Sequence, residues 1–193
     1  MTLSTLDERT ALIVVDLQNA ILAYPTAHPN TDVIARSAEL ADAFRAHGLP
    51  VVLVNVAGGA PGRTELPRPA GGERPADAMD IVAGLNRAET DHLVTKRTWG
   101  AFTGTDLDEY LRGEGVTQVV VTGIATSAGV ESTARHAHEN GYNVTLATDA
   151  MSDRSLEAHE YVVGAVFPRI GETGTTAEII ELLGSTRGTT VEA

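Results

Sequence analysis

Three places in the chain carry residue types that could do chemistry, and each lies just after a short apolar run. Asp16 follows the apolar run at residues 11–15, and Lys96 follows the run at 92–95. Residues 123–129 form a turn of small residues after the run at 116–122. Ligands of open α/β sheets bind in the crevice outside the carboxyl ends of the strands. We therefore expect the three places to face one crevice if the apolar runs are strands of one sheet.

Asp16 is a candidate proton carrier. It stands directly after five apolar residues, the pattern of a strand that is buried on both faces. Loss of water around a carboxylate raises its pKa, which suits a group that donates or accepts a proton near neutral pH. The alternative is a turn-forming aspartate that bonds the backbone of residues 17–19. Residue type alone does not separate these two interpretations.

Lys96 and the turn at residues 123–129 are candidate anion-binding groups. Lys96 could hold Asp16 in its charged form or bind a ligand carboxylate; the alternative is a surface lysine with its stem along apolar residues. Backbone N–H groups before a helix can receive an oxyanion, although small residues also serve simply to fit a tight turn. Thr126 and Ser127 lie in this turn without a histidine nearby in sequence, so we interpret them as helix-capping residues rather than nucleophiles.

The composition narrows the class of function. The chain has 193 residues, is 42% hydrophobic and lacks cysteine, which fits one domain (residues 1–193) without disulfides or a thiol nucleophile. Its net charge of −12 argues against binding to nucleic acid or to an anionic membrane, and no apolar run is long enough to span a bilayer. No metal-binding or phosphate-loop motif is present. We expect a cytoplasmic protein that acts on a small molecule without a metal or cofactor.

The rest of the chain must supply the sheet that brings these places together. Apolar runs alternate with segments of helical periodicity, which indicates a parallel sheet covered on both faces. The fifth predicted strand has Asp149 near its end. We predict strands at residues 11–15, 51–56, 92–95, 116–122, 144–147 and 168–170, and helices at 31–47, 76–85, 106–112, 127–140, 155–166 and 177–183.

Residues 57–75 interrupt this alternation. They hold five glycines and four prolines without periodicity, so we predict a long loop that is either a lid over a binding site or a flexible insertion. Residues 184–193 have the composition of a frayed tail. No internal repeat and no boundary of a second domain are visible.

Four motifs taken together resemble the isochorismatase-like hydrolase superfamily, also called cysteine hydrolases. They lie at residues 11–18, 96–107, 122–135 and 147–150, in the expected order, and span most of the chain. The resemblance implies a three-layer α/β/α Rossmann-like sandwich around a six-stranded parallel sheet. It also implies assembly into homo-oligomers, as dimers or tetramers.

The catalytic triad of that family is Asp, Lys and Cys, and the match is incomplete. Asp16 and Lys96 correspond to the first two residues, but Gly129 stands at the position of the cysteine. The resemblance also implies a cis peptide between Ile124 and Ala125, and an oxyanion hole made by the amides of Ala125 and residue 129. Without the thiol, amide hydrolysis through a covalent intermediate has lost its nucleophile.

Two functions follow from the resemblance. True isochorismatases in the family have a glycine at the same place and hydrolyse a vinyl ether. By this resemblance, Asp16 would protonate an enolpyruvyl group of the substrate. Lys96 and the turn amides would hold the substrate carboxylates. Residues 125–128, however, resemble the turn of the cysteine hydrolases with only the cysteine replaced. This supports the alternative, a protein that binds a ligand or partner without turnover, whereas the retained Asp16 and Lys96 beside a glycine favour the hydrolase.

Three further residues are candidate contacts of a substrate. Gln18 lies two residues after Asp16, and Trp99 and Phe102 are two of the few aromatic residues in the chain. Packing beneath the loop at 57–75 is the alternative for the two aromatic residues. The metal site of nicotinamidase-like members is unmatched, because residues 57–60 offer no Asp or His ligand.

Overall fold

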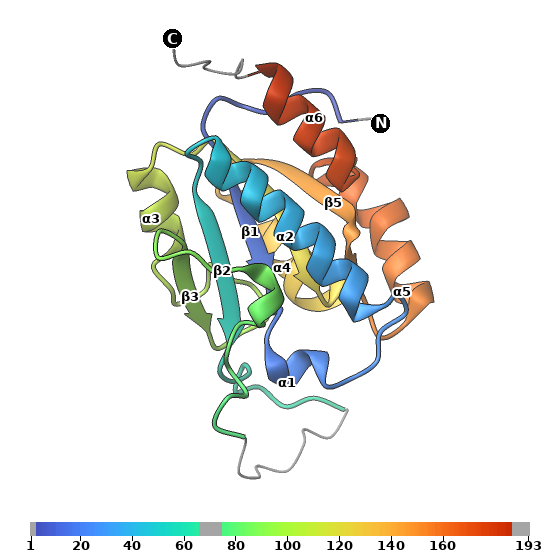
Figure 1. Cartoon of the computed structure of the whole chain (residues 1–193). Helices are drawn as coiled ribbons and strands as arrows, with labels where there is room; N and C mark the ends of the chain where they lie inside the picture. The colour runs from blue at the N-terminus through green and yellow to red at the C-terminus, as the bar shows by residue number, and fades with distance from the viewer. Residues whose placement is uncertain (1–2, 66–74, 187–193) are drawn as a thin grey trace.

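Six parallel strands form one sheet in the order β3-β2-β1-β4-β5-β6 (Figure 1). The computed structural model describes residues 3–65 and 75–186. The predicted three-layer α/β architecture is confirmed, since helices cover both faces of this sheet. The strands are β1 (Thr10–Val15), β2 (Val51–Val56), β3 (His92–Lys96), β4 (Gln118–Ile124), β5 (Asn143–Ser152) and β6 (Glu172–Gly174).

Six α-helices and four short helical turns connect the strands within the described residues. Helices α2 and α6 cover one face, while α3, α4 and the turn that continues α5 cover the other. The helices are α1 (Asn19–Leu22), α2 (Asn30–Ala46), α3 (Leu107–Gly113), α4 (Glu131–Glu139), α5 (Leu156–Tyr161) and α6 (Thr176–Thr186). The turns are η1 (Ala83–Leu85), η2 (Thr126–Val130), η3 (Val162–Val166) and η4 (Phe167–Arg169). No helix among the described residues is long and apolar enough to cross a membrane.

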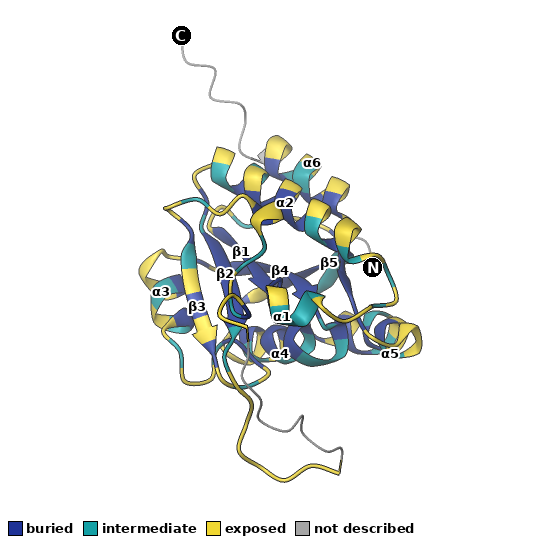
Figure 2. Ribbon diagram, turned by 60° about the horizontal axis from the view of Figure 1, so that its bottom comes forward, coloured by how far each residue is buried: buried dark blue, intermediate teal, exposed yellow. Residues whose placement is uncertain are grey.

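Strand β1 lies at the centre of the sheet and is buried along its whole length. Its alternate residues enter two separate cores, with Ile13 and Val15 packing on the side of α4 and Leu12 and Val14 on the side of α2. A strand covered on both faces must be apolar at every position, which explains its continuous apolar sequence. Figure 2 shows the buried strands between helices whose outer surfaces are exposed.

The strand order places a topological switch point between β1 and β4. The chain runs from β1 through β2 and β3 on one side, and through β4, β5 and β6 on the other. The connections leave β1 and β4 in opposite directions, so a crevice opens above their carboxyl ends. Asp16 and the turn at residues 123–129 are therefore brought to the same crevice.

Two predicted elements are wrong. Residues 168–170 form no strand: Pro168 lies in the first turn of η4, where its missing N–H is tolerated, and the sixth strand follows at Glu172–Gly174. Residues 76–85 form no α-helix; they contain a hydrogen-bonded turn at 76–79, an isolated bridge from Ile81 to Gln18, and the short turn η1. The carbonyl groups of Ala78 and Asp80 instead accept hydrogen bonds from the backbone at the start of α1.

The last helix is longer than predicted. Helix α6 continues through Gly184 to Thr186, so the first three residues of the predicted tail are helical, and residues 187–193 lie outside the described range. One glycine in a helix costs about 1 kcal/mol, which the buried Ile179 and Leu183 offset. Residues 57–65 form neither helix nor strand, as predicted, whereas 66–74 lie outside the described residues.

Candidate active site

Asp16 is the first residue after β1 and turns the chain sharply. Its φ is 56°, in the left-handed region that aspartate tolerates better than most residues. Its N–H donates to the carbonyl of Val54 at 2.9 Å, and its carbonyl accepts from the N–H of Gln18 at 2.9 Å. The residue is only 6% exposed. The turn therefore fixes a carboxyl group at the buried floor of the crevice.

Lys96 pairs with Asp16 from two strands away. It is the last residue of β3 and is 1% exposed, and its Nζ lies 2.9 Å from Oδ2 of Asp16. Strand β2 lies between them, so the two backbones are separated by roughly 10 Å. The long lysine stem spans this gap, and its ammonium also donates to the carbonyl of Trp99. Sequence analysis predicted the pair, and the structure places its two members in contact.

The Asp16 carboxyl group is poised to carry a proton. Burial raises its pKa from 3.8 to about 6, although the charge and hydrogen bond of Lys96 act in the opposite direction. Its Oδ1 atom is buried and has no hydrogen-bond partner among the described residues. Lys96 supplies the counter-charge at Oδ2, whereas Oδ1 is buried without a partner, so a proton on the carboxyl group would best be placed on Oδ1. The two oxygens therefore differ: Oδ2 faces Lys96, and Oδ1 is the one that can hold and release a proton.

Gly129 leaves room for this pair. It lies in the turn η2, and its φ is outside the left-handed region, so its backbone conformation alone does not require glycine. A Cβ atom there would lie 3.0 Å from Nζ of Lys96, 3.0 Å from Cγ1 of Val15 and 3.1 Å from Oδ2 of Asp16. These contacts are tighter than nine in ten real Cβ contacts, so the neighbouring atoms would have to shift by a few tenths of an ångström. The reason for glycine is therefore space.

The turn between β4 and η2 has the backbone that the family resemblance implied. The peptide between Ile124 and Ala125 is cis, as expected. Gly123 has a φ of 116°, and a Cβ atom there would lie 2.0 Å from the carbonyl oxygen of Val15. Only glycine fits this close approach of β4 to β1. The small residues of the turn thus let its backbone pass directly beside Asp16.

A cavity of about 320 Å³ brings five predicted site residues together. Asp16, Lys96, Trp99, Ala125 and Gly129 all line it. Its volume is at the small end of the range for ligand pockets, roughly 300–1,000 Å³. The described residues contain no group of three or more His, Asp or Glu side chains placed to hold a metal ion.

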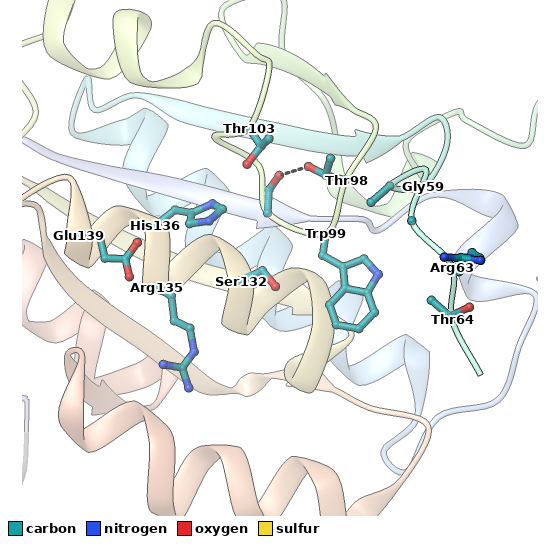
Figure 3. A pocket seen from close by; sticks show the side chains of 13 residues that line it. Gly59, Arg63, Thr64, Thr98, Trp99, Thr103, Ser132, Arg135, His136 and Glu139 are labelled. Carbon is teal, nitrogen blue, oxygen red and sulfur yellow. Dashed lines mark hydrogen bonds between the residues drawn. The ribbon is translucent and has the colours of Figure 1, made fainter. Parts of the chain in front are cut away.

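A second pocket, of about 500 Å³, adjoins the cavity and shares Thr98 and Trp99 with it. Figure 3 shows the Trp99 ring between Ser132 of α4 and the described part of the loop, at Arg63 and Thr64. Trp99 is 66% exposed. Trp99 therefore forms a wall between the two hollows.

Gln18 and Phe102 do not line the cavity, contrary to their assignment as substrate contacts. Gln18 is 1% exposed; its side-chain amide donates to the carbonyls of Val56 and Ala78, and its oxygen accepts from the N–H of Val56. It holds the end of β2 in place. Phe102 packs against the core on the α4 side of the sheet, with its ring 6.0 Å from that of Tyr142.

Asp153 lines the cavity but was not among the predicted site residues, because Asp149 was expected near the end of the fifth strand. The ladder between β4 and β5 is irregular after Val121, and β5 continues to Ser152, so Asp149 lies within the strand. Asp149 accepts from the N–H of Thr176 at 2.8 Å and anchors α6. Asp153 instead lies at the strand end, lines the cavity and accepts from the N–H of Ser127 at 2.7 Å.

Thr126 has a histidine beside it that the sequence did not indicate. Its Oγ1 lies 2.9 Å from Nδ1 of His159, and burial together with nearby His28 lowers the pKa of His159. Thr126 is nevertheless fully buried and is not among the residues that line the cavity. The contact joins the turn η2 to α5 and gives no accessible nucleophile.

The fold and the site define an α/β protein with a buried aspartate–lysine pair at the switch point of a parallel sheet. The model of the isochorismatase domain matches residues 10–178, and the chain belongs to the isochorismatase family. It is 43% identical over 180 residues to the isochorismatase family protein YwoC of Bacillus subtilis, covering 90% of this chain and 94% of that one. It is 40% identical over 180 residues to the family protein YecD of Escherichia coli O157:H7, covering 90% and 96%.

A solved structure shares both fold and sequence. The isochorismatase family protein from Burkholderia thailandensis superposes with a TM-score of 0.88 at 42% identity, covering 93% of this chain and 97% of that one. This similarity confirms the predicted family and fold class. The solved relative therefore has the same overall fold as the chain described above.

Proposed function

We propose that this protein is a hydrolase of a small carboxylated metabolite, which cleaves a vinyl ether with Asp16 as the general acid. The observation that carries the proposal is the state of the Asp16 carboxyl group: its pKa is raised to about 6, and its buried Oδ1 lacks a partner among the described residues. A general acid works best when its pKa lies near the working pH. Asp16 lines the cavity, so a substrate bound there would lie beside this carboxyl group.

The reaction would proceed in three steps. Asp16 donates its proton to the methylene carbon of an enolpyruvyl group, and the ether oxygen stabilises the resulting oxocarbenium ion. Water adds to the cationic carbon and gives up a proton, which returns to Asp16. The hemiketal then breaks its bond to the alcohol oxygen, which takes up the hydroxyl proton, so that one water molecule converts the vinyl ether into pyruvate and an alcohol.

The lysine and the turn have supporting roles in this proposal. Lys96 holds Oδ2 of Asp16 at 2.9 Å, so the protonated oxygen keeps one orientation. The turn residues Ala125 and Gly129 line the same cavity, where their amides would face the substrate carboxylate. Trp99 would lie along the apolar part of the substrate.

A pyruvate-release assay with isochorismate tests the proposal. The wild type should release pyruvate, and Asp16→Asn, which keeps the shape but not the proton, should be slower by a factor of roughly 10² to 10⁴. Asp149→Asn is a matched control, because this carboxylate anchors α6 and lies outside the cavity lining. No release by the wild type, or equal release by Asp16→Asn, would refute the proposed reaction.

A binding protein without turnover is the second candidate. It is favoured by the turn, which keeps its cis peptide and its bond from Ser127 to Asp153 although the chain has no cysteine. In that case ligands would bind in the cavity, while no enolpyruvyl compound would be hydrolysed. A binding measurement that needs no turnover separates the two functions.

A further inference from the structure

We infer that Arg154 recognises a carboxylate of the ligand, so that the cavity selects small anionic compounds over neutral compounds of the same shape. The inference rests on the proposed function, because it names the substrate class of the same cavity. Two cationic side chains, Lys96 and Arg154, line that cavity. The question is which of them can bind a ligand carboxylate.

The ammonium group of Lys96 is already bound to groups of the protein. It is 1% exposed, its Nζ lies 2.9 Å from Oδ2 of Asp16, and it also donates to the carbonyl of Trp99. Moving it toward a ligand would leave the Asp16 carboxylate buried without its counter-charge, which is strongly unfavourable. Lys96 therefore orients the acid rather than capturing a carboxylate at the mouth of the cavity.

Arg154 has no ion pair with a carboxylate of the described residues. Its sequence neighbour Asp153 also lines the cavity, but that carboxylate accepts from the N–H groups of Ser127 and Ser155. The guanidinium of Arg154 thus remains available to an anion from outside.

The structure also holds Arg154 in place. Its guanidinium carbon lies 4.4 Å from the centre of the Tyr24 ring, which lines the same cavity. The segment that carries Tyr24 is tied to the end of β5, because Ala27 donates its N–H to the carbonyl of Asp153 at 2.7 Å. A guanidinium stacked on a ring keeps its N–H edge free, and that edge matches a carboxylate with two parallel hydrogen bonds.

The aromatic residues that line the cavity indicate what the uncharged part of the ligand is. Tyr24 and Trp99 are 49% and 66% exposed, and both line the cavity. A small, partly apolar ring beside these aromatic side chains, with a carboxylate on Arg154, is compatible with the volume of about 320 Å³. The inferred ligand class is therefore a small cyclic carboxylate.

Fluorescence of Trp99 tests this inference without turnover, because it is the only tryptophan in the chain and lines the cavity. Benzoate and benzamide serve as probes, since they share a ring and differ in charge. We expect benzoate to bind with a dissociation constant about tenfold or more below that of benzamide. Arg154→Gln should abolish this preference, whereas the matched variant Arg112→Gln, outside the cavity lining, should keep it.

Three results would overturn the inference: no saturable response to benzoate, equal binding of the two probes by the wild type, or an unchanged preference in Arg154→Gln. Arg154→Lys should show an intermediate preference, because it keeps the charge but loses the paired hydrogen bonds. If the benzoate preference holds while no pyruvate is released, the proposed reaction fails and the inferred ligand class stands. Pyruvate release without a benzoate preference would support the reaction and overturn the inferred ligand class.

Discussion

The ammonium nitrogen of Lys96 lies 3.0 Å from the point that a Cβ atom on Gly129 would occupy. The Asp16–Lys96 pair and Val15 lie close on three sides of this point, so a side chain at position 129 would need these neighbours to shift. A glycine at this position leaves the Asp16–Lys96 pair undisturbed. The proposed reaction requires this, because Asp16 is its general acid.

Adding a single carbon at position 129 should therefore lower activity. In Gly129→Ala, we expect kcat/KM to fall roughly tenfold or more and the free energy of unfolding to fall by roughly 1–3 kcal/mol, because the new methyl group crowds Lys96 and Val15. Gly164→Ala is the matched control, since a Cβ atom there meets nothing within 4 Å. Steady-state kinetics and denaturant unfolding measure both effects. Full activity in Gly129→Ala would contradict the tight contact.

Restoring the family cysteine should not restore thiol chemistry. In Gly129→Cys, we expect no amide hydrolysis, because the new Cβ atom crowds Lys96 and Asp16 and should disturb the pair that would have to activate the thiol. Assays with small amides, combined with labelling by a thiol reagent, check this. If the variant hydrolyses amides, the native protein is better described as a disabled cysteine hydrolase.

The pH dependence of the reaction should follow the protonation of Asp16. Burial raises its pKa to about 6, and only the protonated form donates, so kcat/KM should be highest below that pH and decline above it. In Lys96→Gln the opposing charge is removed, so the decline should move upward by about one pH unit or more. A pH profile of pyruvate release measures both. A rate that rises with pH through this range would mean that Asp16 acts as a base.

Two carboxylates at or near the end of β5 should behave differently. Asp153→Asn weakens the hydrogen bond that the Ser127 N–H donates to this side chain. The turn η2 should then shift relative to the substrate, and we expect kcat/KM to fall roughly tenfold. Asp149→Asn weakens the anchoring of α6 through Thr176 and removes the ion pair with Arg36 of α2, so it should lower the melting temperature with kcat/KM nearly unchanged. Kinetics and thermal unfolding of the two variants provide the comparison. Equal kinetic effects would argue against a role of Asp153 in the site.

Thr126 should matter for stability and not for chemistry. Thr126→Val removes the bond to His159 in a buried position, which we expect to lower the free energy of unfolding by about 1–3 kcal/mol. Because Thr126 does not line the cavity, kcat/KM should stay within a few-fold of the wild type. Loss of activity without loss of stability would instead identify Thr126 as a nucleophile.

The central strands, their alternation with helices, and the members of the Asp16–Lys96–Gly129 set could be predicted from the sequence. A strand buried on both faces needs an unbroken apolar run, and helices need a repeat of about 3.6 residues, so both patterns are local. The elements that escaped prediction obey longer-range constraints. The segment at residues 76–85 follows hydrogen bonds to α1, and the sixth strand begins only after the turn around Pro168.

How these residues work together depends on the tertiary structure. The irregular pairing of β4 with β5 puts Asp153 in the cavity and Asp149 under α6, and no local pattern distinguishes the two aspartates. The pKa of Asp16 depends on burial, and the stacking of Arg154 on Tyr24 joins two loops that are far apart in sequence. Residue types and strand ends can be predicted from neighbours along the chain. Partners, burial and pKa values arise from strand register and packing across the sheet, which bring together residues that are distant in the sequence.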